Sequence, residues 1–103
     1  MSFSKPIISI VTPTYNREDE LIHLIESIQK QSLSSEYFEM IISDDGSTDG
    51  TAEKVKEWQK EVSFNLLYIS QKNLGPGAAR NNGVDNSNGE LIVFIDSDCS
   101  LNQ

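Results

Sequence analysis

The sequence predicts an α/β fold with a mostly parallel sheet of about four strands and helices on both of its faces. Short apolar runs rich in β-branched residues alternate with segments of helical periodicity along the chain. The runs are almost continuously apolar, which is typical of strands buried on both faces. Since strands and helices alternate from beginning to end, we expect right-handed crossovers between parallel strands.

The first strand is predicted over residues 7–11, "IISIV", and the polar stretch 12–16 closes it. A helix follows, because four apolar residues recur at the spacing of a single helix face. Acidic residues 18–20 lie in its first turn, where the helix dipole favours them, and Asn16 is the expected N-cap. The apolar face consists of Leu21, Leu24, Ile25 and Ile28.

The second strand is predicted over residues 38–43, "FEMIIS", and it runs into the turn-forming stretch "DDGSTDG". The next helix is expected from Thr51 to about Lys60, with Ala52, Val55 and Trp58 facing inward and Glu and Lys side chains facing solvent.

The third strand is predicted over residues 64–70, "FNLLYIS". Residues 73–86, "NLGPGAARNNGVDN", begin with Gly and Pro and therefore predict a loop that leads into a short helix. The fourth strand is expected over residues 90–95, "ELIVFI". The complete order of four strands and three helices is that of a Rossmann-like sheet.

Composition excludes several classes of protein. The chain has 103 residues and a net charge of −8, which argues against a nucleic-acid-binding surface. No apolar run approaches the ~20 residues that a transmembrane helix needs. Cys99 is the only cysteine and can form no internal disulfide, so a cytoplasmic location is expected.

Polar clusters follow or border the carboxyl ends of the predicted strands, where open parallel sheets bind ligands. Each cluster alone has a structural explanation: Asp44-Asp45-Gly46-Ser47 could be a turn with a helix cap, and Arg80 a surface cation. Together the clusters predict a site at this edge, which the Thr12–Asn16 stretch, Asp44-Asp45, Gly75-Pro76-Gly77 with Arg80, and Asp96 with Asp98 would form.

Asp96 and Asp98 are the least easily explained pair, because two carboxylates so close together repel each other unless a cation binds between them. Ligand sets made only of oxygen suit Mg²⁺ or Mn²⁺, which bind through one or two carboxylates and substrate phosphates. A helix beginning near Gly77 and the guanidinium of Arg80 would add anion-binding groups. The edge thus predicts a metal-assisted diphosphate site.

Four stretches in this order, "ISIVTPTYNRED", "IISDDGSTDGT", "NLGPGAARNNGV" and "GELIVFIDSD", resemble the nucleotide-binding half of the family-two glycosyltransferases. The resemblance covers nearly the whole chain, and it implies the GT-A fold and a nucleotide-diphospho-sugar donor. It implies that Pro13, Thr14 and Tyr15 border the nucleoside and that Asp45, with Asp44 beside it, accepts the N3–H of uracil. It further places Gly77 and Arg80 near the nucleotide, Asp96 at the ribose and Asp98 on the metal.

The resemblance implies an inverting transfer from a donor, a UDP-sugar by this reading, to an acceptor hydroxyl. In the full-length protein the acceptor would be a glycan or a lipid-linked sugar, and the protein could work at the cytoplasmic face of a membrane. One position departs from the family pattern: a further Asp often follows the Asp-x-Asp motif, and Cys99 stands there. Two alternatives remain, a nucleotide-binding module without activity and a receiver domain, whose acids would follow other strands.

Residues 1–103 are expected to form only the donor-binding part of a domain truncated after the Asp-x-Asp motif. In the family, the general base and the acceptor pocket follow that motif, so no catalytic residue is assigned in this chain and the chain alone is expected to be inactive. An uncovered sheet edge near the fourth strand would favour self-association.

Overall fold

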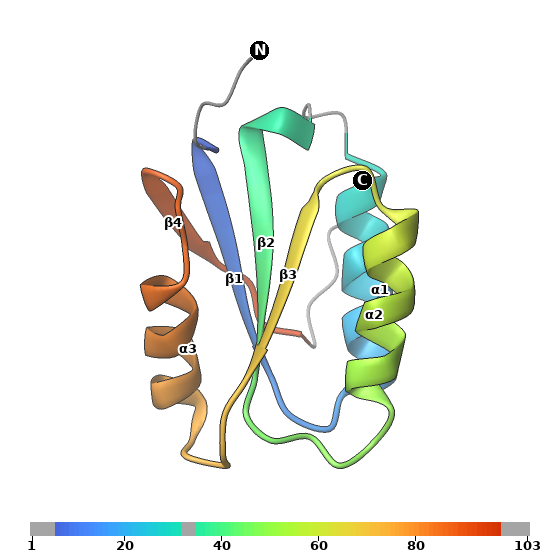
Figure 1. The fold of residues 1–103 in the computed structure, drawn as a ribbon, viewed down its shortest axis with the longest axis vertical. Coiled ribbons are helices and arrows are strands. Elements are labelled where there is room, and N and C mark those ends of the chain that lie inside the picture. Colours follow the sequence, from blue (N-terminus) through green and yellow to red (C-terminus); the bar gives the residue numbers. More distant parts are fainter. Residues whose placement is uncertain (1–5, 32–34, 98–103) are drawn as a thin grey trace.

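Four strands form a single sheet in which every pairing is parallel. The computed structural model describes residues 6–31 and 35–97. Strand order in the sheet is β3-β2-β1-β4, so β1 lies between β2 and β4 (Figure 1). The predicted α/β fold is confirmed. The strands are β1 (Ile8–Thr14), β2 (Phe38–Asp44), β3 (Asn65–Ser70) and β4 (Leu91–Phe94).

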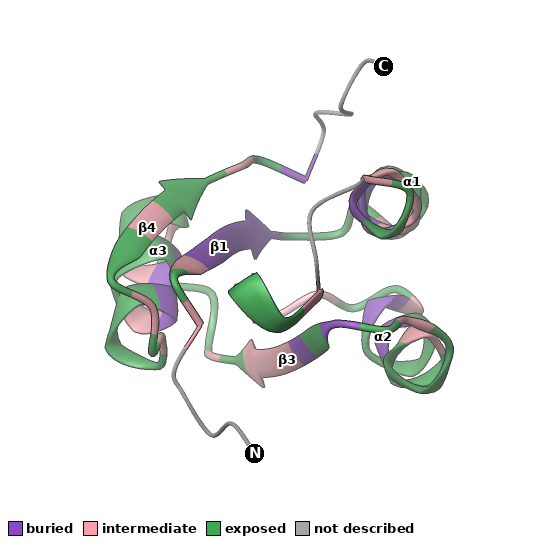
Figure 2. Cartoon of the chain, turned by 90° about the horizontal axis from the view of Figure 1, so that it is seen from above, coloured by how far each residue is buried: buried purple, intermediate pink, exposed green. Residues whose placement is uncertain are grey.

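Helices cover both faces of the sheet, as predicted (Figure 2). The helices α1 (Glu18–Gln29) and α2 (Thr51–Glu61) pack against each other on one face. Helix α3 (Pro76–Asp85) lies on the other face against β1 and β2. A short 3₁₀ helix, η1 (Ser35–Tyr37), precedes β2. The crossovers through α1 and α2 both run in one direction along the sheet, from β1 to β2 and from β2 to β3. The crossover through α3 runs in the opposite direction, from β3 back to β4. Because crossovers of one hand that run in opposite directions lie on opposite faces, α3 covers the other face.

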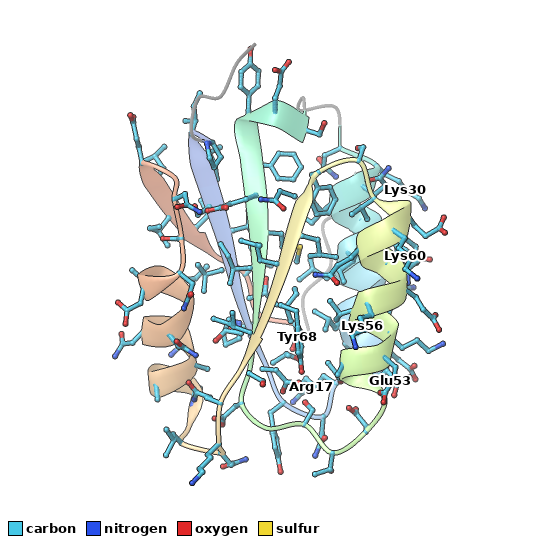
Figure 3. All side chains as sticks on the ribbon, viewed as in Figure 1. Arg17, Lys30, Glu53, Lys56, Lys60 and Tyr68 are labelled. Carbon is cyan, nitrogen blue, oxygen red and sulfur yellow. The ribbon has the colours of Figure 1, made fainter. Side chains whose placement is uncertain are left out.

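The main apolar core lies between the sheet and the α1–α2 pair. The four apolar residues predicted for the face of α1 are all buried in it, and strand residues on alternate positions complete it. Phe38 and Phe64 pack with their ring centroids 5.0 Å apart. The exposed lysines of α2 lie on its outer surface, where Figure 3 shows Lys56 and Lys60. The strand residues in this core are Ile10, Phe38, Met40, Ile42 and Leu66.

Strand β1 is longer than predicted because Pro13 continues it. Proline cannot donate a hydrogen bond and normally interrupts a central strand. Here β4 pairs with β1 only as far as Val11, so the side of β1 on which Pro13 lacks an N–H has no strand left to pair with. On the other side β1 remains paired with β2 through Thr14. The extension carries Pro13 and Thr14 to the carboxyl edge.

Two details of the predicted helices are wrong. Helix α1 begins at Glu18 with Arg17 as its N-cap, and Asn16 instead bonds to the loop before α2. Ala52 is exposed, whereas the preceding Thr51 is buried. Helix α2 therefore presents a narrower apolar face to the core, formed by Val55 with Trp58 partly buried beside it.

A buried carboxylate fixes β4 beside β1 at the amino edge of the sheet. Glu39 in β2 is 1% exposed, and it accepts hydrogen bonds from the hydroxyl of Ser9 at 2.6 Å and the backbone N–H of Asn88 at 2.6 Å. The hydroxyl of Ser9 in turn accepts the N–H of Gly89 at 2.7 Å. A buried charge needs such partners. These bonds tie the turn before β4 to β1 and β2, and so set where β4 begins.

Close packing of α3 on the sheet gives a first prediction. A Cβ at Gly83 would collide with Val11, which is fully buried, whereas a Cβ at Gly77 would meet nothing within 4 Å. We expect Gly83→Ala to lower the free energy of unfolding by about 1–3 kcal/mol through overpacking. Gly77→Ala should raise it by up to ~1 kcal/mol through helix propensity. Urea denaturation measures both; an equal gain for the two variants would contradict the packing described.

Candidate functional site

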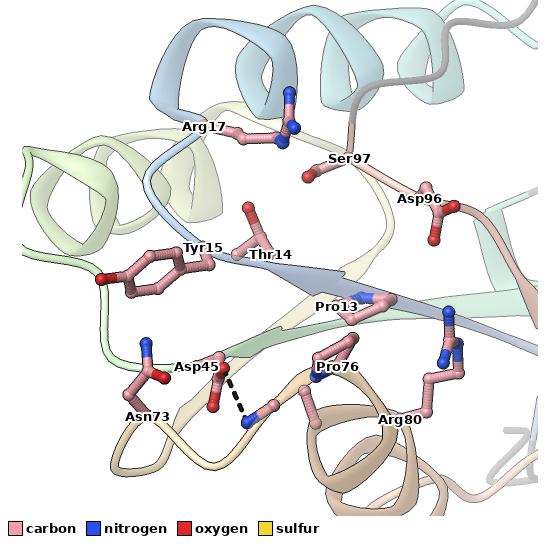
Figure 4. A pocket seen from close by; sticks show the side chains of 12 residues that line it. Pro13, Thr14, Tyr15, Arg17, Asp45, Asn73, Pro76, Arg80, Asp96 and Ser97 are labelled. Atoms are coloured by element: carbon pink, nitrogen blue, oxygen red, sulfur yellow. Dashed lines mark hydrogen bonds between the residues drawn. The ribbon is translucent and has the colours of Figure 1, made fainter.

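A pocket of about 460 Å³ opens at the carboxyl ends of β1, β2 and β4 (Figure 4). Its volume lies within the ~300–1,000 Å³ that is usual for small-molecule sites. The loops after these strands, the loop between β3 and α3, and the beginning of α3 form its walls. The lining residues are Pro13, Thr14, Tyr15, Arg17, Asp45, Asn73, Gly75, Pro76, Ala79, Arg80, Asp96 and Ser97.

The topology explains why the pocket lies at this place. From β1 the chain moves to β2 and β3 on one side, and then returns over the opposite face to β4 on the other side. Neighbouring loops therefore diverge at the carboxyl end of β1, which leaves a crevice between them. The parallel register aligns Thr14 with Asp44 and Val11 with Phe94, so residues after three strands reach the same crevice.

Six of the eight residues predicted to bind the nucleotide line this pocket. Asp44 and Gly77 do not line it, and Asp98, the predicted metal ligand, lies outside the described residues, as does Cys99. Gly77 is an exposed residue in the first turn of α3, next to Gly75 and Pro76, which do line the pocket. The six are Pro13, Thr14, Tyr15, Asp45, Arg80 and Asp96.

Asp44 stabilises the loop after β2 but does not line the pocket. Its carboxylate accepts the hydroxyl of Tyr68 at 2.5 Å and the backbone N–H of Ser47 at 2.9 Å. Burial and the hydrogen bond to Asp44 raise the pKa of Tyr68 above its usual value, so this phenol stays a donor. Successive side chains of a strand point to opposite faces, and Asp44 accordingly points to the side of the sheet where Tyr68 lies.

Asp45 holds the loop between β3 and α3 against the pocket. Oδ1 accepts the side-chain amide of Gln71 and the backbone N–H of Leu74, both at 2.8 Å, and Oδ2 accepts the N–H of Gly75 at 3.0 Å (Figure 4). The hydrogen bond from Gln71, opposed by burial and reinforced by the two backbone bonds, lowers the pKa of Asp45. Asp45 is therefore an ionised acceptor that shapes the pocket wall.

The loops before α1 and α2 are joined by reciprocal hydrogen bonds. Asn16 has a left-handed φ of 52°, and its Oδ1 accepts the N–H of Thr48 at 2.8 Å and that of Asp49 at 3.3 Å. Glu18 accepts the N–H of Gly50 at 2.9 Å, while Asp49 accepts the N–H of Glu18 at 3.3 Å. Each loop thus caps the helix of the other. This arrangement fixes Tyr15 and Arg17, on either side of Asn16, at the pocket.

Sequence reasoning missed four residues that line the pocket. Arg17 lies between the predicted N-cap Asn16 and the acids of the first helical turn, and Ser97 is the middle residue of the Asp-x-Asp motif. Asn73 precedes the glycine-rich stretch, and Ala79 lies one turn into α3. A helix N-terminus that follows a strand end was the signal that could have identified Arg17, because such a residue must lie at the carboxyl edge.

Charge in the pocket is divided between two guanidiniums and two carboxylates. Among the described residues Arg17 forms an ion pair with Glu20, at 3.9 Å, and Arg80 forms none. The described residues contain no cluster of three side chains that could hold a metal ion. Of the two acids that line the pocket, Asp45 accepts hydrogen bonds from its neighbouring loop. Asp96 is exposed, and its carboxylate forms no hydrogen bond with the described residues. One free carboxylate fits Mg²⁺ or Mn²⁺, which take their other ligands from phosphates and water.

Comparison with known sequences identifies the family. The sequence profile described as glycosyl transferase family 2 matches residues 9–103. The chain belongs to glycosyl transferase family 2. The predicted resemblance is thereby confirmed. Within the described part of the chain, no helix is both long and apolar enough to cross a membrane.

Relatives in this family are named glycosyltransferases. The chain is 38% identical to glycosyltransferase GlyA of Streptococcus pneumoniae over 93% of its length, which is 13% of that protein. It is 37% identical to the GalNAc(5)-diNAcBac-PP-undecaprenol β-1,3-glucosyltransferase of Campylobacter jejuni, covering 93% of the chain and 31% of that protein. The chain thus spans less than a third of each of these relatives.

Solved structures show the same fold. Residues 1–349 of Staphylococcus aureus TarS in complex with UDP-GlcNAc superimpose with a TM-score of 0.81 and 32% identity, over 93% of this chain and 28% of that one. The mannosyltransferase PcManGT from Pyrobaculum calidifontis, in complex with GDP-Man and Mn²⁺, superimposes with a TM-score of 0.90 at 24% identity, over 98% and 30%. The second likeness supports the fold alone.

The bonds of Asp45 give a prediction for the loop between β3 and α3. Asp45→Asn replaces one acceptor oxygen by a donor, so the amides of Leu74 and Gly75 cannot both stay bonded as they are. Losing a hydrogen bond to a charged group costs roughly 1.5–3 kcal/mol. We expect amide hydrogen exchange at these two positions to become roughly 10–100-fold faster, while the exchange of β1 amides is unchanged. Unchanged exchange at Leu74 and Gly75 would contradict the role of Asp45.

Proposed function

We propose that this chain is the donor-binding part of a glycosyltransferase and binds a nucleoside diphosphate sugar, with UDP as the nucleotide. The observation that carries the proposal is the convergence of Tyr15, Asp45, Arg80 and Asp96 on one pocket at the point where the strand order reverses. These four residues come from four separate segments of the chain. They supply an aromatic ring, an ionised acceptor, a guanidinium and a free carboxylate.

Base recognition is assigned to Tyr15 and Asp45. Tyr15 is 44% exposed at the pocket, so its ring offers a stacking surface to a base. A carboxylate has about four lone-pair positions, and the loop uses three of them on Asp45. The remaining position, on Oδ2, can accept the N3–H of uracil. Cytosine has an acceptor at N3, so the same ionised oxygen would repel it.

Phosphate binding is assigned to Arg80 and the beginning of α3. Arg80 lines the pocket without a carboxylate partner among the described residues. Helix α3 begins at Pro76, and the N–H groups of its first turn, to which Gly77 belongs, carry partial positive charge. A guanidinium beside a helix N-terminus suits a diphosphate, which carries several negative charges.

A divalent metal is proposed as the cofactor, Mg²⁺ or Mn²⁺, held by Asp98 of the Asp-x-Asp motif with Asp96 facing the ribose. When bound, such an ion neutralises charge on a diphosphate and thereby improves it as a leaving group. Asp96, two positions before Asp98, lines the pocket together with Arg17 and Arg80, so the Asp-x-Asp motif begins at the proposed diphosphate site, which supports the assignment. The metal complex of PcManGT is a property of that protein and is consistent with this proposal.

The rest of the reaction is proposed for a protein of the length of these relatives, of which this chain would be the donor-binding part. We propose inverting transfer of the sugar to a hydroxyl of a glycan or lipid-linked acceptor, in the cytoplasm or at the cytoplasmic face of a membrane. Complexes of TarS with UDP-GlcNAc and the name of the Campylobacter relative support a UDP-sugar and a lipid-linked acceptor as the chemical classes. We expect the 103-residue chain itself to bind nucleotide without transferring sugar.

Calorimetry with UDP and CDP, each with and without Mn²⁺, tests the proposal. UDP should bind more tightly than CDP, because replacing a donor by an acceptor opposite Asp45 costs roughly 1.5–3 kcal/mol. Mn²⁺ should strengthen UDP binding, and Asp98→Ala should remove most of that gain.

Asp85→Ala is the matched control, since it removes an exposed acid at the far end of α3 from the pocket. It should bind UDP and Mn²⁺ as the parent chain does. Equal affinity for UDP and CDP would refute the assignment of Asp45. Metal-dependent binding that survives Asp98→Ala would refute the metal site.

A further inference from the structure

One part of the pocket has no role in the proposed donor contacts. It lies between β1, the start of α1 and the segment after β4, and Thr14, Arg17 and Ser97 line it. Figure 4 shows the guanidinium of Arg17 extending towards Ser97, with the hydroxyl of Thr14 pointing to the same side of β1. Arg80 lies on the other side of β1. Two polar groups from the junction of β1 and α1 and one from the segment after β4 therefore face one space.

Thr14 carries a hydroxyl without a partner. The residue is 4% exposed, and its Oγ1 forms no hydrogen bond with any of the residues that the structure describes. Buried hydroxyls in native proteins are nearly always bonded to protein, water or ligand, because an unpaired one is costly. Thr12 has the same unpaired hydroxyl two residues earlier, but it is fully buried and does not line the pocket. Thr14 is the one of the two whose position suits a ligand.

Arg17 occupies a position that the helix itself disfavours. It is the N-cap of α1 and makes no side-chain cap, and a cation at a helix N-terminus opposes the helix dipole. Its ion pair with Glu20 is 3.9 Å long between side chains that are 49% and 51% exposed, so it contributes little to stability. An anion in the pocket would give the guanidinium a partner of better geometry.

We propose that Arg17, Thr14 and Ser97 form a second oxyanion subsite, which takes the terminal phosphate of the nucleoside diphosphate. The inference rests on the proposed function and extends it to Arg17 and Ser97, which lie outside the predicted site. A diphosphate crossing the carboxyl end of β1 meets Arg80 on the α3 side and Arg17 on the α1 side. The hydroxyls of Thr14 and Ser97 then donate to the oxygens that Arg17 holds.

Titration of Arg17→Gln with UDP and UMP, followed by calorimetry, tests the subsite. UDP affinity should fall roughly tenfold or more, since a charge-assisted hydrogen bond is lost, whereas UMP affinity should change less than about twofold. Lys30→Gln is the control, because it removes the same charge at the opposite end of α1 (Figure 3). It should leave both affinities nearly unchanged.

Each other outcome overturns the inference. UDP affinity that survives Arg17→Gln removes Arg17 from the site, and an equal loss for UMP and UDP assigns it to the first phosphate. An equal loss in Lys30→Gln would show an effect of net charge alone. Failure of the parent chain to bind UDP would instead refute the proposed function, so the two failures are distinguishable.

Thr14→Val and Thr12→Val form a second, matched pair. Both remove an unpaired buried hydroxyl at nearly constant volume, so both should raise the melting temperature in the absence of ligand. Only Thr14→Val should weaken UDP binding, because only Thr14 lines the pocket. UDP affinity that is equal in the two variants would remove the Thr14 hydroxyl from the subsite.

Discussion

The parallel pairing of β1 with β2 on one side and with β4 on the other is the constraint on which the site depends. It places the residues after three strands at the same edge, although they are as far apart in sequence as Tyr15 and Ser97. The buried network of Glu39, Ser9 and the turn at Asn88 sets the register at the opposite edge. A shift of β4 by one residue would turn its side chains to the other face and would move Asp96 away from β1.

Loops at this edge are held by carboxylates and amides rather than by apolar packing. Asp45 binds the loop before α3, Asp44 binds the loop after its own strand, and Asn16 joins the loops before α1 and α2. Backbone N–H groups are the donors in all three cases, which satisfies polar atoms that a turn would otherwise leave unpaired. The pocket is therefore largely formed before any ligand binds, and the free groups on it are Arg80, Asp96, Tyr15 and the Thr14 hydroxyl.

Much of this could be predicted from sequence. Alternating apolar strands and amphipathic helices fixed the fold class, and the rule that parallel sheets bind ligands at their carboxyl edge gathered six of the eight predicted residues into one pocket. What could not be predicted depends on the third dimension. Pro13 continues β1 only because β4 stops early, and Asp44 turns towards Tyr68 while Asp45 turns to the pocket. Asn73 joins the site through loop geometry that no local pattern encodes, whereas the place of Arg17 at a helix N-terminus after a strand could have identified it.

The central claim is that a nucleoside diphosphate binds across the carboxyl edge at β1. Titration of the ¹⁵N-labelled chain with UDP and Mg²⁺, followed by amide chemical shifts, tests it most directly. The account predicts shifts concentrated in residues 13–17, 45–47, 73–80 and 95–97, with residues 63–66 and 86–90 at the amino edge unchanged. Shifts concentrated at the amino edge, or spread evenly over the outer faces of α1 and α2, would contradict the account.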